Sequence, residues 1–221
     1  MDVKSYMTSA VVTVSQETKV LEALDMMKEN DFHRLPVVKN GQMIGLITQE
    51  IIQENSPSTA TSLSIHEMNY LLTKTKVGDI MQKKVLTIHA DDLLEEAASR
   101  MRDQKIGVLP VVEEGNKIVG IITDKDIFSA FIDIMGYNHK GSRIVIDIPE
   151  DHPGILEDIT NILAEAQISI NQIAVYRKDY FTQVIIQMDS PNVNAIKEIV
   201  TTSGYTVSSA IYKEGKINNN N

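Results

Sequence analysis

The sequence predicts a mixed α/β (α+β) fold in which two copies of a β-α-β-β-α unit pack sheet to sheet and a βαββαβ domain follows. The first observation is an internal repeat, because residues 7–41 align with residues 81–115 at a constant shift of 74. After a one-residue insertion the alignment resumes between residues 42–52 and 117–127, and 15 of the 46 aligned positions are identical. The second observation is that residues 143–213 lack the repeat but still alternate strand and helix patterns. A duplicated unit and an unrelated third domain therefore account for the chain.

Each copy begins with a short β-rich stretch, Val11–Val14 or Val85–Ile88, and continues into a helix. Apolar residues recur at helical spacing after Thr18 in the first copy and after Asp91 in the second. Both residue types accept hydrogen bonds from free backbone N–H groups. We therefore expect Thr18 and Asp91 to cap these two helices.

The second half of each copy predicts a hairpin and a final helix. Leu-Pro-Val-Val at 35–38 and 109–112 reads as a strand whose proline suits its start, and a glycine turn with a second apolar strand follows. The final helices are expected to begin after Thr48 and Thr123. A unit of about fifty residues buries too little surface alone, so we expect the two copies to pack sheet to sheet.

The third domain has its own order of elements. The expected order is strand 144–148, helix 155–166, strands 168–176 and 181–188, helix 192–202 and strand 205–212, with Gly204 closing the second helix. This βαββαβ order over about seventy residues is the ferredoxin-like arrangement.

These patterns give predicted domain boundaries. The predicted ranges are 1–54 for the first copy, 55–76 for a linker, 77–137 for the second copy, 138–142 for another linker, 143–213 for the third domain and 214–221 for a disordered tail. Within the first linker, a polar loop runs into Ser64-Ile65-His66-Glu67, a capping box that predicts a short connecting helix.

Composition excludes several classes of protein. Of the 221 residues, 21 are Lys or Arg and 30 are Asp or Glu, giving a net charge of -9 that argues against general nucleic-acid binding. With no cysteine, the chain has no disulfide or thiolate zinc site, which fits a cytoplasmic location. No apolar run approaches the roughly 18 residues of a membrane span. The start Met1-Asp2-Val3-Lys4 lacks the pattern of a secretory signal.

Short motifs give the chain a family resemblance. They are Leu-Pro-Val-Val at 109–112, Gly-Ile-Ile-Thr-Asp-Lys-Asp-Ile at 120–127, Asp-His-Pro-Gly-Ile-Leu at 151–156 and Ile-Ser-Ile-Asn at 168–171. The first two, with the Met-Thr and Met-Gln starts of the copies, resemble a pair of CBS (cystathionine-β-synthase) domains. The last two resemble an ACT domain. The order CBS–CBS–ACT is similar to proteins of the acetoin-utilisation B (AcuB) type, from Val3 to Tyr212.

The resemblance implies a nucleotide site in a cleft of the CBS pair. In this family a carboxylate after Gly-x-x-Thr-x-x-Asp holds ribose hydroxyls, and a helix N-terminus beside it favours phosphate. The pattern is complete at Gly120–Asp126, whereas the first copy has Ile51 at the carboxylate position. Gly107 would leave room for a base where the first copy has His33. We therefore expect one site per chain.

The predicted nucleotide-binding residues all come from the second copy. They are Lys84, Val85, Thr87, Gly107, Val108, Leu109, Pro110, Thr123, Lys125 and Asp126. Lys83, Lys84 and Lys125 are candidate phosphate contacts. A purely structural interpretation stays open, because Thr123 and Asp124 suit the cap of the following helix and Asp126 suits its dipole without a ligand.

The resemblance to ACT domains implies an amino-acid site at an interface between paired domains. The corresponding residues are Asp151, His152, Gly154, Ile155 and Asn171. Asp151 places a negative charge where binders of this family often have a neutral side chain, so we favour a helix N-cap role for it. His152 is expected to be an exposed turn residue.

Catalysis has no support in the sequence. The five histidines show no metal-ligand spacing, and no nucleophile elbow is present. We expect a non-enzyme that requires no cofactor. Two functions remain open. One is a sensor that binds an adenosine nucleotide (AMP, ADP or ATP) and controls an unknown partner in carbon (acetoin-type) or amino-acid metabolism or transport. The other is a ligand-independent oligomerisation module. In both cases we expect a homodimer through the CBS and ACT domains, without nucleic-acid or membrane partners.

Overall fold

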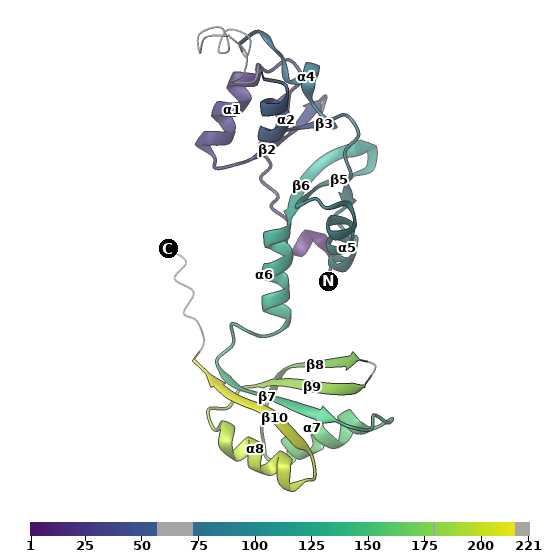
Figure 1. Cartoon of the computed structure of the whole chain (residues 1–221), viewed down its shortest axis with the longest axis vertical. Helices are drawn as coiled ribbons and strands as arrows, with labels where there is room; N and C mark the ends of the chain where they lie inside the picture. Colours follow the sequence, from purple (N-terminus) through teal and green to yellow (C-terminus); the bar gives the residue numbers. More distant parts are fainter. Residues whose placement is uncertain (57–72, 179, 215–221) are drawn as a thin grey trace. The chain divides into compact units, whose positions relative to one another are not determined.

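The computed structural model describes residues 1–56, 73–178 and 180–214. It divides into two compact units, Met1–Ile127 and Phe128–Asn221, which are described separately below (Figure 1). The predicted connecting helix after Ser64 and nearly all of the predicted tail lie outside the described residues.

The first unit contains both copies of the repeat, and they fold alike. The elements are η1 (Val3–Ser5), β1 (Val14–Ser15), α1 (Val20–Glu29), β2 (Arg34–Lys39), β3 (Gln42–Thr48), α2 (Gln49–Glu54), α4 (Val77–Ile80), β4 (Ile88–His89), α5 (Leu94–Gln104), β5 (Val108–Glu113), η2 (Glu114–Asn116), β6 (Lys117–Thr123) and α6 (Asp124–Ile134), whose last turns belong to the second unit. In each copy a short first strand pairs in parallel with the Leu-Pro-Val-Val strand, which forms an antiparallel hairpin with the next strand. The predicted unit is therefore confirmed.

The two copies share one sheet and a small core. The strand order is β1-β2-β3-β6-β5-β4, and β3 meets β6 through the pair Gln42–Lys117. Buried Met43 and Leu46 of the first copy pack with Val112 of the second. These contacts bury surface that neither copy covers alone, as the size argument predicts.

The leading segment of the first copy packs on the second copy. Val3 is fully buried there, and its N–H donates to the carbonyl of Asp92 at 3.0 Å. Further along, Thr8 forms a β-bridge with Ile121, with both N–H···O distances at 2.9 Å. Met7 lies so close to Gly120 that a Cβ on this glycine would collide with the methionine sulfur.

The leading segment of the second copy packs on the first in the same way. Val77 is fully buried, and its N–H donates to the carbonyl of Thr18 at 2.9 Å. Leu46 bridges to Gln82, and Met81 lies over Gly45 as Met7 lies over Gly120. The two copies therefore exchange their leading segments, and neither is complete without the other.

This exchange explains why the predicted helix caps are wrong. In the described part of the chain, no side chain caps α1 or α5, although Thr18 and Asp91 were the expected caps. Backbone carbonyls of the exchanged segments take that role. The hydrogen bonds run from Val20 N–H to the Thr75 carbonyl and from Leu94 N–H to the Met1 carbonyl, each at 3.0 Å. Those carbonyls satisfy N–H groups that a helix leaves free at its start.

The second unit confirms the predicted βαββαβ order. Its elements are β7 (Gly141–Ile148), α7 (Ile155–Glu165), β8 (Ile170–Lys178), β9 (Phe181–Met188), α8 (Val193–Thr202) and β10 (Thr206–Lys213). The sheet is antiparallel with the order β10-β7-β9-β8. Both helices lie on one face of this sheet (Figure 1).

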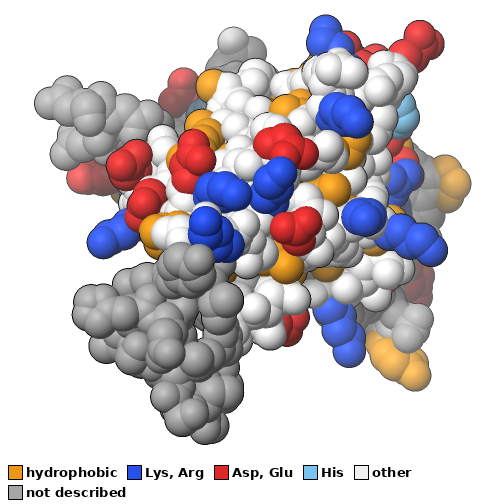
Figure 2. All heavy atoms as spheres, turned by 90° about the horizontal axis from the view of Figure 1, so that it is seen from above, with side chains coloured by type: hydrophobic (Ala, Val, Ile, Leu, Met, Phe, Trp, Pro, Cys, Tyr) orange, Lys and Arg blue, Asp and Glu red, His pale blue; other side chains and the backbone are white. Residues whose placement is uncertain are grey.

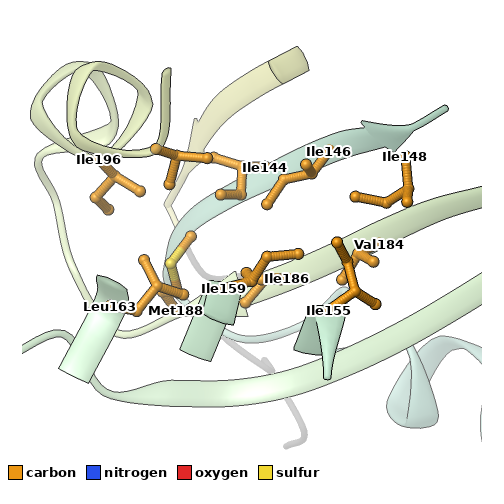
Figure 3. Close-up of a cluster of buried hydrophobic side chains, with 11 residues drawn as sticks. Ile144, Ile146, Ile148, Ile155, Ile159, Leu163, Val184, Ile186, Met188 and Ile196 are labelled. Atoms are coloured by element: carbon orange, nitrogen blue, oxygen red, sulfur yellow. The ribbon is translucent and has the colours of Figure 1, made fainter. Parts of the chain in front are cut away.

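The core of the second unit follows the alternation seen in the sequence. Ile144, Ile146 and Ile148 of β7 point toward Ile159 and Leu163 of α7 (Figure 3). Residues at every second position of a strand share a face, so one face of β7 is buried under the helices.

Candidate ligand-binding site

The first unit contains a hollow to which both copies contribute. It has a volume of about 240 Å³, and we call it the first hollow. Its lining residues are Thr8, Ala10, Val11, Val12, Asp31, Phe32, His33, Arg34, Gly107, Val108, Ile121, Thr123, Asp124 and Lys125. The leading segment of the first copy thus forms one wall, and the start of α6 forms another.

The start of α6 is held by a dense set of hydrogen bonds. Thr123 donates to Asp126 Oδ2 through its N–H at 2.7 Å and through its hydroxyl at 2.8 Å, and the Asp126 N–H donates back to Thr123 Oγ1 at 3.4 Å. This reciprocal arrangement is a capping box. The expectation that Thr123 caps this helix is confirmed.

The carboxylates that line the first hollow are those of Asp31 and Asp124. Asp126 is half-buried and is not among the described residues that line it. Asp124 N–H donates to the Gly107 carbonyl at 3.1 Å, and Asp124 Oδ1 accepts from Lys125 N–H at 2.8 Å. The sequence predicted only a helix-cap role for Asp124, and nothing in the repeat pattern marks it as a ligand contact.

Gly107 lies beside the end of the exposed Asp124 side chain. A Cβ at this position would lie 3.0 Å from Asp124 Oδ2, closer than nearly all real contacts. The Asp124 carboxylate therefore occupies part of the space beside this glycine, which also lines both hollows.

The predicted nucleotide-binding residues fall into three places. Gly107, Val108, Thr123 and Lys125 line the first hollow, whereas Val85 lines a second hollow of about 300 Å³. The second hollow is lined by Arg34, Leu46, Thr48, Glu50, Gln82, Val85, Leu86, Lys105, Ile106, Gly107 and Val108. The predicted residues are divided between the two hollows because the copies exchange their leading segments. The segment around Val85 faces the first copy, and the segment around Val11 faces the second.

The remaining predicted residues have local structural contacts. Leu109 and Pro110 are buried within β5, and the Thr87 carbonyl accepts a hydrogen bond from Arg100 at 2.7 Å. Lys84 is exposed and lines neither hollow.

The second hollow has an acidic group of its own. Glu50 lines it, and a hydrogen bond from its own backbone N–H and another from the Thr48 hydroxyl lower the pKa of this carboxyl. The side chain of Ile51, at the position of Asp126, packs against the core of the first copy. The second hollow therefore has a carboxylate at Glu50, one residue before Ile51, where the repeat pattern would place it.

In the second unit, a third hollow of about 360 Å³ contains two of the five predicted residues, His152 and Ile155. Asp151 Oδ2 instead accepts from Arg177 Nε at 2.8 Å. The predicted N-cap role of Asp151 is wrong, because Gly154 is the N-cap of α7 and has φ +98°. Asn171 is exposed, at a bulge in β8.

Three further observations concern metal ligands, membrane spans and surface charge. No group of three or more His, Asp or Glu among the described residues could hold a metal ion. No helix in the described ranges is long and apolar enough to cross a membrane. The face shown in Figure 2 mixes acidic and basic side chains instead of presenting a continuous basic track.

The chain combines an exchanged repeat, whose two copies share a hollow, with a ferredoxin-like domain. It is therefore a protein built from small domains, and domains of this kind have many different functions. Residues 3–55 and 77–133 match the CBS domain, and residues 142–201 match the ACT domain. The chain therefore consists of a CBS domain pair followed by a C-terminal ACT domain.

Three similar proteins extend this result. The uncharacterized protein MJ1225 of Methanocaldococcus jannaschii is 32% identical over 130 residues, which cover 58% of this chain and 46% of that protein. Its crystal structure matches with a TM-score of 0.52. A candidate acetoin utilization protein (AcuB) from Vibrio cholerae is 26% identical, with a TM-score of 0.51, covering 62% of this chain and 93% of that one. A structure of CBSX2 in complex with AMP is 27% identical, with a TM-score of 0.50, covering 60% and 97%.

These comparisons define how far the resemblance extends. The chain spans less than half the length of MJ1225. AcuB is a distant structural neighbour, so the CBS–CBS–ACT order is established while the AcuB type is not.

Proposed function

We propose that this protein is a non-catalytic sensor in which the CBS pair binds an adenosine nucleotide in the first hollow. The observation that carries this proposal is that the hollow is built jointly by both copies, so that a ligand there contacts segments far apart in the chain. The complex of CBSX2 with AMP supports an adenosine ligand for a similar domain pair.

The chemistry of the first hollow suits a nucleoside. Val11, Val12 and Phe32 offer an apolar surface for a base, and Asp124 offers oxygen atoms for hydroxyl donors. Asp126 does not itself line the first hollow; its Oδ2 accepts both hydrogen bonds from Thr123, which does, and its proposed role is to position that wall for the ligand. Lys125 remains the proposed phosphate contact from the second copy.

From the order of the domains we propose a wider role in regulating a partner protein. Ligand binding in the CBS pair would bias a homodimer formed through the CBS and ACT domains, and that change would regulate a partner protein. A coupling free energy of about 1–3 kcal/mol between the sites would suffice. This proposal also includes control of carbon (acetoin-type) or amino-acid metabolism, an amino acid bound near His152 and a cytoplasmic location.

A ligand-independent oligomerisation module is the alternative. The capping box favours it, since hydrogen bonds within the protein already account for Asp126 and Thr123. The two functions differ in one measurable property, the response of stability to a nucleotide.

Thermal unfolding with and without AMP tests the sensor function. A ligand that binds with micromolar affinity should stabilise the protein by about 4 kcal/mol at millimolar concentration. The Asp126→Ala variant should lose most of this gain, whereas Ile51→Ala, at the matched position of the first copy, should keep it. Each gain is measured against the same variant without ligand, so that lost packing or capping cancels. No gain in the wild type would favour the oligomerisation module, and equal gains in both variants would contradict the role of Asp126.

A further inference from the structure

We propose that the end of α6 and the turn after it make a releasable contact with the open face of the ACT sheet, and that the buried amide of Gln187 keeps this contact weak. The open face is the one opposite the helices α7 and α8. The residues of this contact all belong to the second unit. The inference goes beyond the proposed function, since it requires no ligand.

Several contacts attach the end of α6 to the sheet. Gln172 Nε2 of β8 donates to the Asp133 carbonyl at 2.8 Å. Lys213 Nζ of β10 donates to the Tyr137 carbonyl at 3.3 Å and lies 3.0 Å from the centroid of its ring. Gly136 has φ +65°, and a Cβ on this residue would collide with Gln172 Oε1. Glycine therefore permits both the backbone conformation and the close approach to the sheet.

Gln187 of β9 lies at the centre of this contact. Its neighbours Ile186 and Met188 belong to the core under the helices, so the side chain between them points to the open face. Gln187 is only 2% exposed, yet neither its Oε1 nor its Nε2 has a hydrogen-bond partner among the described residues. Oε1 of Gln172, the residue paired with Gln187 in β8, is also buried without a partner. The docked arrangement therefore leaves polar atoms of two amides unsatisfied.

These unsatisfied atoms oppose docking. An amide that loses water without gaining a partner destabilises the arrangement that buries it, and release would return it to water. The cavity at this contact has a volume of about 10 Å³, which is room for one water molecule at most. It is lined by Ile134, Met135, Gln172, Ala174, Ile185 and Gln187. Apolar contacts and the Gln172 hydrogen bond favour docking while the buried amides oppose it, so the docked and released states are close in free energy.

The position of this contact on α6 gives it a use. The first turn of α6 contains Asp124 and Lys125, which line the first hollow, and its last residue, Ile134, lines the cavity at the sheet. Release would change how the ACT sheet is attached to the helix that forms a wall of the first hollow. Coupling between sites needs an element with two discrete states, and this contact supplies one.

Methyl NMR of the full chain tests the inference, with the Met135 methyl group in the cavity as the reporter. We expect relaxation dispersion of this group to show exchange between the docked state and a minor released state. Gln187→Met keeps a side chain of similar length and should lower the released population about tenfold, because it removes a buried polar group without a partner. Gln183→Met is the matched control. This amide of the same strand and face donates to Asp147 Oδ1 at 2.8 Å, so its loss should leave the exchange at Met135 unchanged.

Gly136→Ala should act in the opposite direction and shift the Met135 methyl signal toward the released state. The added Cβ would collide with Gln172 and would strain a backbone at φ +65°. Gly204→Ala is its control, because Gly204 has φ +95° but no atom within 4 Å of an added Cβ. It strains the backbone of the same unit without touching the contact, so the Met135 signal should stay in place.

Several outcomes would overturn the inference. Absence of exchange at Met135 in the wild type, or unchanged exchange in Gln187→Met, would show that the contact is not held weak by this amide. Urea unfolding of Gln187→Met gives a second measurement, and we expect a higher midpoint for the second unit. A lower midpoint would mean that a water molecule in the cavity satisfies the amide and that the contact is permanent. None of these measurements involves a nucleotide, so the inference can fail while the sensor function stands, and the reverse also holds.

Discussion

At the scale of single residues, the Asp126 carboxylate can be explained either as part of a helix cap or as a ligand contact. The Asp126 side chain closes a capping box with Thr123, whereas the matched pair in the first copy, Thr48 and Ile51, has only the bond from Ile51 N–H to Thr48 Oγ1 at 3.2 Å. The sequence predicted the importance of position 126 but could not decide between cap and ligand contact, because both uses require an oxygen acceptor at this place.

The two caps should differ in their contribution to stability. Thr48→Ala should cost about 1 kcal/mol, which is typical for loss of an N-cap hydroxyl. Thr123→Ala should cost more, because the Thr123 hydroxyl donates to the half-buried Asp126 carboxylate, whereas the Thr48 hydroxyl donates to the exposed Glu50 carboxylate. Urea unfolding of the two variants measures the difference, and an equal loss in both would show that the carboxylate adds nothing to this cap.

At the scale of elements, periodicity predicted most helices and strands, but it could not predict how their ends are satisfied. The apolar spacing that located α1 and α5 is local, whereas the carbonyls of Thr75 and Met1 that accept from their first turns come from exchanged segments. The same exchange explains why the predicted site residues separated. Val85 and Thr123 belong to one copy in sequence, yet they line different hollows because each leading segment crosses to the other copy.

The exchanged segments give a matched pair of core substitutions. Val3 and Val77 occupy equivalent positions at the repeat shift, and both side chains are fully buried. Val3→Ala and Val77→Ala should each lower the free energy of unfolding of the first unit by about 2 kcal/mol. Leu86→Ala, whose side chain is 46% exposed, should cost much less. Chemical denaturation tests this, and a neutral Val3→Ala would mean that the N-terminal segment does not pack on the second copy in solution.

At the scale of the whole molecule, the domain order could be predicted from the sequence because each module leaves a strong local pattern. The repeat, the alternation in β7 and the Leu-Pro-Val-Val strands all survive as regular structure. The ligand site was harder to predict, since its walls come from four separate segments whose proximity is a consequence of topology. Arg34 and Asp124 illustrate this point, because the sequence predicted neither as a ligand contact and both line the first hollow in the folded chain.

Because the chain divides into two compact units, we expect the two units to unfold separately. Each unit has its own core, so calorimetric unfolding of the full chain should show two transitions. AMP should raise only the transition of the first unit, because a ligand stabilises the unit whose folded state binds it. Ile186→Ala identifies the other transition, since this fully buried side chain of β9 belongs to the core of the second unit and its loss should cost about 2–5 kcal/mol there. A single transition that AMP and Ile186→Ala both shift would mean that the ACT domain and the CBS pair unfold as one cooperative body. A ligand in the first hollow would then reach the ACT domain through shared stability, and a change of dimer arrangement would not be needed for the regulatory signal.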